Sequence, residues 1–431
     1  MNDIFLKRIK EYFPHKYNEY LECLNIPCTK GFFINHLKGS TEDIKKIIDF
    51  DYFPSDLSEE SYYHDEENIG KTKAYELGLI YPQEIAASLT TKDINPDEIN
   101  TVVDLCAAPG GKTINIINRL NREVLLISND NSHLRASILS SNIERMGFDN
   151  VIVTNKETSV LAEELEGFAD LVILDAPCSG EGMVRKYPEI IDNYNLNNIY
   201  ELSDIQKKIL EDAYKICKNK GMIIYSTCTY AFEEDEDQII SFLERHKDME
   251  LIPYKDSKGS KLEGAIKLSP LDNTEGQFMV MLRKNGEVKD NRIKYLKPVK
   301  EKLVDDFIKE NTDISKYYLY KHNDKFYISF MPLPDMKHNV LKYGVQVGEI
   351  INKRFEPSHH FYRSNHLRSY FRYVYDLSDE EYDRYISGNE IHAETDNHYY
   401  LITYKGYSLG YGKCSNHQIK NKYPKGLRRV V

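Results

Sequence analysis

The chain has 431 residues, of which 41% are hydrophobic and 29% charged, and its formal net charge is −11. This composition is typical of a folded protein, and the length exceeds one ordinary core, which predicts two to four structural units. No apolar run approaches the roughly 20 residues of a membrane span, and the first residues contain no hydrophobic signal-peptide core, so we expect a cytoplasmic protein. The seven cysteines include no CxxC pair, which argues against a disulfide framework or a metal site.

Charge is distributed unevenly along the chain. Residues 41–70 hold ten acidic and two basic side chains, whereas residues 401–431 hold seven Lys or Arg and no acidic residue. This basic tail interleaves tyrosines with cations, a pattern typical of RNA-contacting surfaces. A solvated basic face explains the tail equally well, so composition alone leaves both interpretations open.

The predicted elements change character near residue 100. Residues 1–95 are expected to be helical at first and then mixed. Beyond them, apolar strands alternate with helical segments, which predicts βαβ units and a parallel, doubly wound sheet. The expected strands are 101–106, 124–130, 151–155, 171–176 and 222–227, and the expected helices start at Lys112 and cover 132–147 and 204–217. A polar linker is predicted at 283–294, followed by short tyrosine-rich strands of a small α+β or barrel-like region.

A glycine-rich segment, DLCAAPGGKT (104–113), joins the first of these strands to its helix. Such a turn lets backbone amides and a helix N-terminus approach a ligand closely. A P-loop is excluded because Cys106 occupies its leading glycine position, and the GxGxxG of a dinucleotide fold is absent. The remaining candidate is S-adenosylmethionine. Asp130 follows Gly111 by nineteen residues, near the offset of about 20 for a ribose-binding acid, and its alternative role is a helix cap.

Two cysteines follow predicted strands. Cys178 lies in LVILDAPCSGEG and Cys228 in GMIIYSTCTYAFEEDE. Because ligands bind at the carboxyl ends of the strands in open α/β sheets, both thiols are expected beside the cofactor loop. A lone cysteine is usually structural, but two at neighbouring strand ends favour covalent catalysis.

These three motifs together resemble the RNA 5-methylcytosine methyltransferases of the NOL1/NOP2/Sun (RsmB/RsmF) family, above all the bacterial RsmF type that modifies 16S ribosomal RNA. Further similar segments are YPQEIAAS (81–88), SNIERMGFDNVIVTN (141–155), TEGQF (274–278) and RFEPSHH (354–360). The closing GYGKCSNHQIKNKYPKGLR is similar to the family's PUA-like tail. Two positions depart from the family pattern, since Phe33 replaces an arginine and Tyr194 a frequent tryptophan.

The resemblance implies an α/β fold with a Rossmann-like class I methyltransferase domain. An N-terminal α+β RNA-binding unit would precede this domain, and a C-terminal PUA-like α+β or barrel region would follow it. The expected boundaries are 1–95 for the N-terminal unit, 96–285 for the methyltransferase domain, 286–365 for an intermediate α+β unit and 366–431 for the PUA-like domain. The implied activity is S-adenosylmethionine-dependent formation of 5-methylcytosine in 16S rRNA, naked or in the small ribosomal subunit, without a metal.

Cytosine C5 is a poor nucleophile, so this chemistry needs a thiolate that first adds to C6. By analogy with DNA cytosine methyltransferases, the Pro-Cys pair nominates Cys178 as that nucleophile. The resemblance to the RNA family implies instead that Cys228 attacks and Cys178 assists product release. Asp175 is a candidate to hydrogen-bond cytosine N3, or else holds its own loop. Arg185 and Lys186 are candidate phosphate contacts.

The predicted cofactor site combines the glycine-rich loop with acids at later strand ends. Its members are Cys106, Ala107, Ala108, Pro109, Gly110, Gly111, Lys112, Asp130, Glu157 and Asp175. Lys112 is assigned to the cofactor carboxylate or to an acidic partner, with a solvated lysine as the alternative. Asn155 rivals Glu157 as the adenine contact. The acidic run 233–238 is predicted to be a solvated helix start.

Two other functions remain open at this point. One is the same chemistry on transfer RNA, and the other is a catalytically silent RNA-binding factor for ribosome assembly. The presence of Cys178, Cys228 and Asp175 argues against a silent protein, because a dead site has no chemical need for two thiols.

Overall fold

The computed structural model describes residues 2–120, 124–287 and 293–429. Residues 288–292 of the predicted linker and the last two residues of the basic tail lie outside the described residues. None of the described helices has the length and apolar character needed to cross a bilayer.

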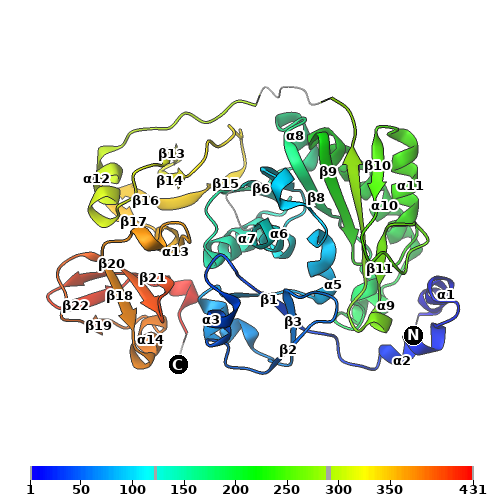
Figure 1. Cartoon of the computed structure of the whole chain (residues 1–431), viewed down its shortest axis with the longest axis horizontal. Helices are drawn as coiled ribbons and strands as arrows, with labels where there is room; N and C mark the ends of the chain where they lie inside the picture. The colour runs from blue at the N-terminus through cyan, green and yellow to red at the C-terminus, as the bar shows by residue number, and fades with distance from the viewer. Residues whose placement is uncertain (1, 121–123, 288–292, 430–431) are drawn as a thin grey trace.

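Within the described chain, a mixed sheet of nine strands occupies the centre of the molecule (Figure 1). Its parallel part has the order β9-β8-β5-β6-β7, formed by β5 (Thr101–Asp104), β6 (Leu125–Asn129), β7 (Val151–Thr154), β8 (Ala169–Asp175) and β9 (Cys217–Thr227). Antiparallel strands extend both edges: β12 (Gln277–Lys284), β10 (Met249–Ile252) and β11 (Ile266–Leu268) beyond β9, and β15 (Val340–Tyr343) beyond β7. The predicted parallel strands are thus confirmed, and the sheet as a whole is mixed.

Helices cover both faces of this sheet, which explains why its strands are continuously apolar. Along β8, Val172 and Leu174 pack on the side of α8, α10 and α11, whereas Leu171 and Ile173 pack on the side of α6 and α7. The helices are α6 (Gly111–Leu120), α7 (His133–Met146), α8 (Thr158–Glu164), α10 (Leu196–Ile216) and α11 (Glu236–Arg245). α10 begins eight residues before the predicted 204–217.

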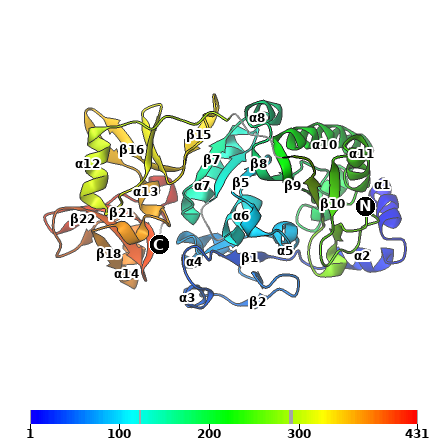
Figure 2. The ribbon, with the colours of Figure 1, turned by 45° about the horizontal axis from the view of Figure 1, so that its top comes forward.

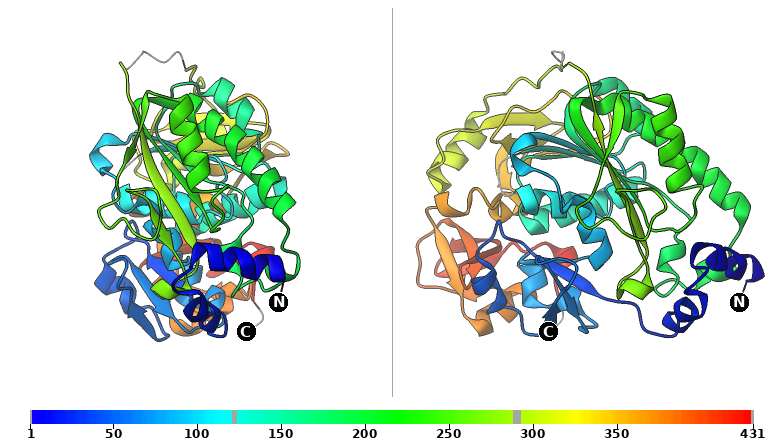
Figure 3. Two further views of the ribbon diagram at one scale, coloured as in Figure 1. Left: turned by 90° about the vertical axis from the view of Figure 1, so that its right-hand side faces the viewer. Right: turned by 45° about the vertical axis from the view of Figure 1, so that its right-hand side comes forward.

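The N-terminal residues divide into two parts. α1 (Asp3–Tyr12) and α2 (Tyr17–Cys23) pack against Val184, Tyr194 and Tyr230 beside α9 (Glu189–Asp192), as Figure 3 shows at one end of the molecule. A four-stranded sheet of order β2-β3-β1-β4 follows. Its strands are β1 (Gly31–Ile34), β2 (Tyr52–Pro54), β3 (Ser61–His64) and β4 (Ile80–Pro82), with the short helices α3 (Thr41–Lys45), α4 (Lys73–Glu76) and α5 (Ile85–Ser88).

Two small sheets form the C-terminal part. The first has the order β13-β14-β16-β17 and comprises β13 (Tyr318–His322), β14 (Lys325–Ser329), β16 (Val345–Ile351) and β17 (Arg354–Pro357), with α12 (Lys302–Asn311) and α13 (His359–Arg363). The second has the order β18-β20-β21-β22-β19 and comprises β18 (Val374–Leu377), β19 (Ile391–His392), β20 (Tyr399–Tyr404), β21 (Tyr407–Ser415) and β22 (Gln418–Asn421), with α14 (Asp379–Ile386).

The N-terminal and C-terminal sheets share one hydrophobic core, although they are far apart in sequence. Phe32 and Ile34 of β1 belong to the same buried cluster as Ile402 and Leu409 of the last sheet, and Figures 1 and 2 show the two units side by side. The side chain of Arg363 is buried at this junction. Its guanidinium donates to the carbonyl oxygens of Glu76, Arg145, Ser408 and Leu409 at 2.6–3.1 Å. Both ends of the chain are therefore tied to α7 of the central domain.

The tyrosines of the basic tail lie in the core and do not form an RNA-facing surface. Tyr404, Tyr407, Tyr411 and Tyr423 are all at most 7% exposed. Lysines such as Lys420 alternate with them and point into solvent. The tail therefore exposes cations to solvent, whereas its aromatic rings stabilise the fold.

Candidate active site

The loops that carry the two cysteines meet at the carboxyl edge of the neighbouring strands β8 and β9. The strand register pairs Asp175 with Ser226, and each cysteine follows within a few residues. The two Sγ atoms lie 3.3 Å apart, and the backbone N–H of Cys228 donates to Cys178 Sγ, also at 3.3 Å. The hydrogen bond to Cys228 and burial both raise the pKa of Cys178 well above its usual value. The structure thus brings together the two thiols that the strand pattern placed at one edge.

Asp175, at the end of β8, is held by two donors. Ser226 Oγ donates to one carboxylate oxygen at 2.9 Å, and Lys112 Nζ lies 2.8 Å from the other. The Lys112 side chain is only 8% exposed, which excludes the solvated alternative. Of its predicted roles, the one present in the structure is the ion pair with an acid of the site.

A cavity of about 600 Å³ lies over this strand edge. Its volume is within the range of pockets for small organic ligands, roughly 300–1,000 Å³. The residues that line it are Leu105, Cys106, Asp130, Asn131, Arg135, Glu157, Thr158, Ser159, Asp175, Ala176, Pro177, Cys178, Ile205, Lys208, Ile209, Asp212 and Cys228. Both thiols, the carboxylates of three strand-end or loop residues and that of Asp212 in α10 therefore line one space.

The predicted cofactor residues fall into two groups. Cys106, Asp130, Glu157 and Asp175 line the cavity. Residues 107–112 are not among the residues that line the cavity; residues 107–110 form the turn before α6, in which Gly110 has a φ of 117°, and Gly111 and Lys112 begin the helix. A side chain at Gly110 would be strained in that backbone conformation, so the glycine is needed for the turn itself. Asn155 donates its side-chain amide to the Asp130 carbonyl at 2.8 Å and does not line the cavity, which leaves Glu157 as the better placed of the two rivals.

Asp130 does not cap the following helix. The N-cap of α7 is Ser132, whose hydroxyl accepts the N–H of Arg135. Asp130 is 2% exposed; it accepts the N–H of Ser132 at 3.0 Å and lies 3.3 Å from an Arg135 nitrogen. The carboxylate faces the cavity and can accept hydrogen bonds from neutral hydroxyl groups, so its position fits a ribose.

One predicted phosphate contact is wrong. The Arg185 side chain is 4% exposed and pairs with Glu275, which is itself 1% exposed, at 2.7 Å. It also donates to the carbonyl of Thr274 at 2.7 Å. These partners hold its guanidinium inside the protein, where it cannot reach a phosphate. Lys186, the next residue, is exposed.

The acidic run 233–238 also differs from the prediction. Glu234, Asp235 and Glu236 are buried at the start of α11, and among the acids of this run only Asp237 is exposed. Lys267 pairs with Asp235 at 2.9 Å and with Glu236 at 2.7 Å. The predicted solvated helix start is therefore wrong for three of these acids. The sequence did contain a signal for their burial, because these acids directly follow the Cys228 motif at the end of a buried strand.

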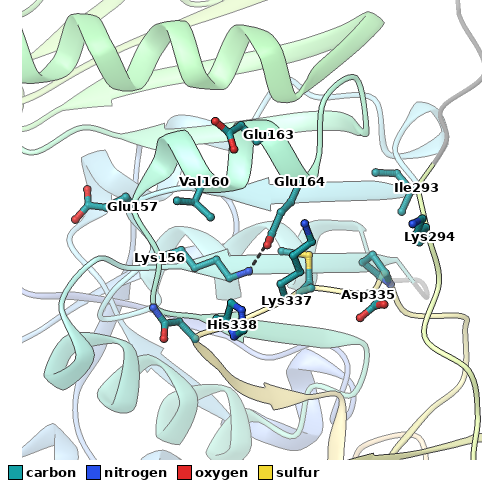
Figure 4. Close-up of a pocket in the computed structure, with 13 residues that line it drawn as sticks. Lys156, Glu157, Val160, Glu163, Glu164, Ile293, Lys294, Asp335, Lys337 and His338 are labelled. Carbon is teal, nitrogen blue, oxygen red and sulfur yellow. Dashed lines mark hydrogen bonds and ion pairs between the residues drawn. The ribbon is translucent and has the colours of Figure 1, made fainter.

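A second cavity, of about 580 Å³, was not predicted from the sequence. It lies between α8 and residues 334–339, and Glu157 lines both cavities. In Figure 4, Lys156 reaches across to Glu164 of α8, with which it forms an ion pair of 2.5 Å. Among the residues that the structure describes, no group of three or more His, Cys, Asp or Glu side chains is arranged to hold a metal ion.

Family models match three parts of the chain. The model of 16S rRNA methyltransferase RsmB/F matches residues 91–283, the N-terminal domain of RsmF matches 1–85, and the RsmF PUA domain matches 372–429. The chain belongs to the RsmB/F family of 16S rRNA methyltransferases. Ribosomal RNA small subunit methyltransferase F of Shigella boydii is 25% identical over an alignment of 464 residues, gaps included. The alignment covers 99% of this chain and 96% of the relative.

Solved structures share the fold of this RsmB/F family member. A methyltransferase homologue from Pyrococcus horikoshii is 25% identical with a TM-score of 0.56, over 66% of this chain and 100% of that chain. NSun6 from Pyrococcus horikoshii, solved with SFG, is 21% identical with a TM-score of 0.58, over 66% of this chain and 98% of that chain. Enzymes of this family depend on S-adenosylmethionine, and the cavity beside Asp130 has the size and the acceptor groups to fit that cofactor.

Proposed function

We propose that this enzyme forms 5-methylcytosine in 16S rRNA through a covalent bond between a cysteine sulfur and cytosine C6. The observation that carries the proposal is the pair of thiols 3.3 Å apart at the edge of a cavity lined by the predicted cofactor residues. The full-length similarity to ribosomal RNA small subunit methyltransferase F supports the small-subunit RNA as substrate, naked or assembled. Because the proposed substrate is ribosomal RNA, we also propose that the enzyme acts in the cytoplasm.

Covalent addition solves the low reactivity of cytosine. A thiolate that adds to C6 breaks the C5=C6 double bond and turns C5 into an enamine-like nucleophile. S-adenosylmethionine, when bound, supplies an electrophilic methyl group on a sulfonium. Loss of the C5 proton to a base and cleavage of the S–C6 bond then restore the aromatic ring and the free thiolate. The target base must be unpaired or flipped out of its stack to reach the thiol.

We assign the attack to Cys228 and the release step to Cys178. Only a thiolate is nucleophilic, and the raised pKa of Cys178 keeps that thiol protonated at neutral pH, which supports Cys228 as the attacking group. Cys178 Sγ lies 3.3 Å from Cys228 Sγ, so its S–H can donate a hydrogen bond to the Cys228 thiolate that leaves as the S–C6 bond breaks. The resemblance to the RNA family favours the same assignment.

The other residues orient the two ligands. Asp130 is proposed to hold the ribose hydroxyls, Glu157 the adenine side, and the turn at Gly110 the methionine end of the cofactor. Lys112 and Ser226 fix the Asp175 carboxylate as an acceptor. A fixed acceptor suits cytosine N3 when this atom is protonated during attack, so it would stabilise the adduct.

The test uses Cys178→Ala, Cys228→Ala and, as a matched control, Cys28→Ala. Each protein is incubated with methyl-labelled S-adenosylmethionine and unmodified small-subunit rRNA, and protein–RNA adducts are resolved on a denaturing gel. We expect Cys178→Ala to accumulate an adduct, Cys228→Ala to form none, and Cys28→Ala to behave as wild type. The reverse pattern would exchange the two roles. If wild type neither labels the RNA nor forms an adduct with any variant, the proposal fails, and transfer RNA is the next substrate to test.

A further inference from the structure

We propose that two buried glutamates, Glu181 and Glu234, form a reciprocal clasp that positions the two thiols. Glu181 follows Cys178 in one loop and binds the other loop, whereas Glu234 follows Cys228 and binds the loop of Cys178. Both are positioning residues, because neither lines the cavity. The inference rests on the proposed function and adds to it which residue controls each half of the reaction.

Glu234 holds the backbone on both sides of Cys178. One carboxylate oxygen accepts the N–H of Ser179 at 3.0 Å, and the other accepts the Ser179 hydroxyl at 2.5 Å. Gln206 donates to the same carboxylate at 2.7 Å and to the carbonyl of Pro177 at 2.9 Å. Cys178 is thus fixed between two residues that are both tied, directly or through Gln206, to Glu234.

Glu181 makes the matching contacts after Cys228. One of its oxygens accepts the hydroxyl of Thr229 at 2.9 Å and the N–H of Tyr230 at 3.0 Å. Its other oxygen accepts the hydroxyl of Tyr194. The Thr229 hydroxyl also lies 2.7 Å from that of Ser179, which joins the two halves of the clasp.

The environment of the clasp makes these contacts strong and specific. Both glutamates are 0% exposed, and a carboxylate buried away from water is costly unless donors satisfy it. Glu234 is surrounded by neutral donors, and burial raises its pKa to about 7. Each loop can therefore adopt few alternative conformations that keep these bonds. Reacting groups need such precision, since a misplacement of about 1 Å can reduce a rate about 100-fold.

The reciprocal arrangement predicts different defects for the two glutamates. In Glu234→Gln, the new amide group opposes the donors of Ser179 and Gln206, so Cys178 loses its fixed position while Cys228 keeps its own. Product release then slows about 10- to 100-fold, as expected for the loss of a hydrogen bond to a charged group, and the protein–RNA adduct accumulates as in Cys178→Ala. In Glu181→Gln, adduct formation slows by a similar factor and no adduct accumulates.

The experiment measures single-turnover rates of adduct formation and release with small-subunit rRNA. Asp237→Asn is the matched control, because this acid lies in the same run but is exposed. Thermal denaturation and cofactor binding verify that each variant is folded. If a glutamate variant fails to fold, Ser179→Ala removes one bond of the clasp and is expected to produce a smaller release defect.

The outcomes separate the clasp from the proposed function. Adduct accumulation in Glu234→Gln, a formation defect in Glu181→Gln and wild-type rates in Asp237→Asn support the clasp. If Cys178→Ala traps an adduct but folded Glu234→Gln and Ser179→Ala release product at the wild-type rate, the clasp is overturned while the proposed function stands. If Cys178→Ala traps no adduct and wild type transfers no methyl group, the proposed function itself has failed.

Discussion

Replacing Arg185 by Met tests whether this residue is structural or binds RNA. Its guanidinium pairs with Glu275 at 2.7 Å and also binds the Thr274 carbonyl, with both charged side chains at most 4% exposed. Removing one partner of a buried ion pair leaves an uncompensated charge and costs about 3–5 kcal/mol. We therefore expect Arg185→Met to lower the free energy of unfolding by about that amount.

The loss of unfolding free energy in Arg185→Met should depend on pH. Burial raises the pKa of Glu275, and Arg185 opposes this rise, so the variant raises the pKa further. A carboxyl group whose pKa is higher in the folded than in the unfolded state destabilises the fold increasingly as pH rises between the two values. The deficit of Arg185→Met should thus be larger at pH 8 than at pH 5. In Arg185→Met/Glu275→Gln, which lacks the orphaned charge, much of the loss should be recovered.

Urea denaturation at both pH values measures the effect, with Lys186→Met as the control. Lys186 is exposed, so its replacement should leave the unfolding midpoint unchanged and instead make RNA binding less sensitive to salt. Wild-type stability in Arg185→Met, combined with weaker and less salt-dependent RNA binding, would show that Arg185 binds phosphate and that the reasoning from burial is wrong.

Three further predictions concern the cofactor, the RNA and the pH dependence of folding. Asp130→Ala should weaken S-adenosylmethionine binding at least about tenfold by calorimetry, because hydrogen bonds to charged groups are worth about 1.5–3 kcal/mol; an unchanged affinity would contradict the ribose contact. Replacing the exposed Lys420, Lys422 and Lys425 by Gln should weaken RNA binding. The slope of log binding constant against log salt concentration should fall by about 0.7 per lost phosphate contact, whereas an unchanged slope would exclude these lysines as RNA contacts. Burial raises the pKa of Asp104 from 3.8 to about 7, so its ionisation makes wild type less stable as pH rises through that window. The free energy of unfolding of Asp104→Asn, measured by urea denaturation, should therefore rise relative to that of wild type between about pH 4 and 7. Parallel plots of this free energy against pH for the two proteins would refute the prediction.

The candidate site was largely predictable because its parts lie at the ends of strands. Cys178, Cys228 and Asp175 each end or follow an apolar run, and the rule that parallel strands present their carboxyl ends at one edge brings such residues together. Asp130 was found in the same way, from its distance along the chain to the glycine-rich loop. Residues 107–112 were also predicted as cofactor contacts; they do not line the cavity, and their contact with the cofactor stays a prediction.

The sequence by itself determined the βαβ alternation, the carboxyl-edge loops and the two thiols, since each depends on local periodicity or on a short motif. Only the tertiary structure decided which charges are buried. Arg185 meets Glu275 from 90 positions away, and Glu234 meets Ser179 from 55 positions away. The sequence also did not reveal that β15 joins the central sheet, or that the first and last sheets share a core. The physical reason is that the burial of a charge depends on whether long-range packing supplies a partner, and a local pattern of residue types does not contain that information.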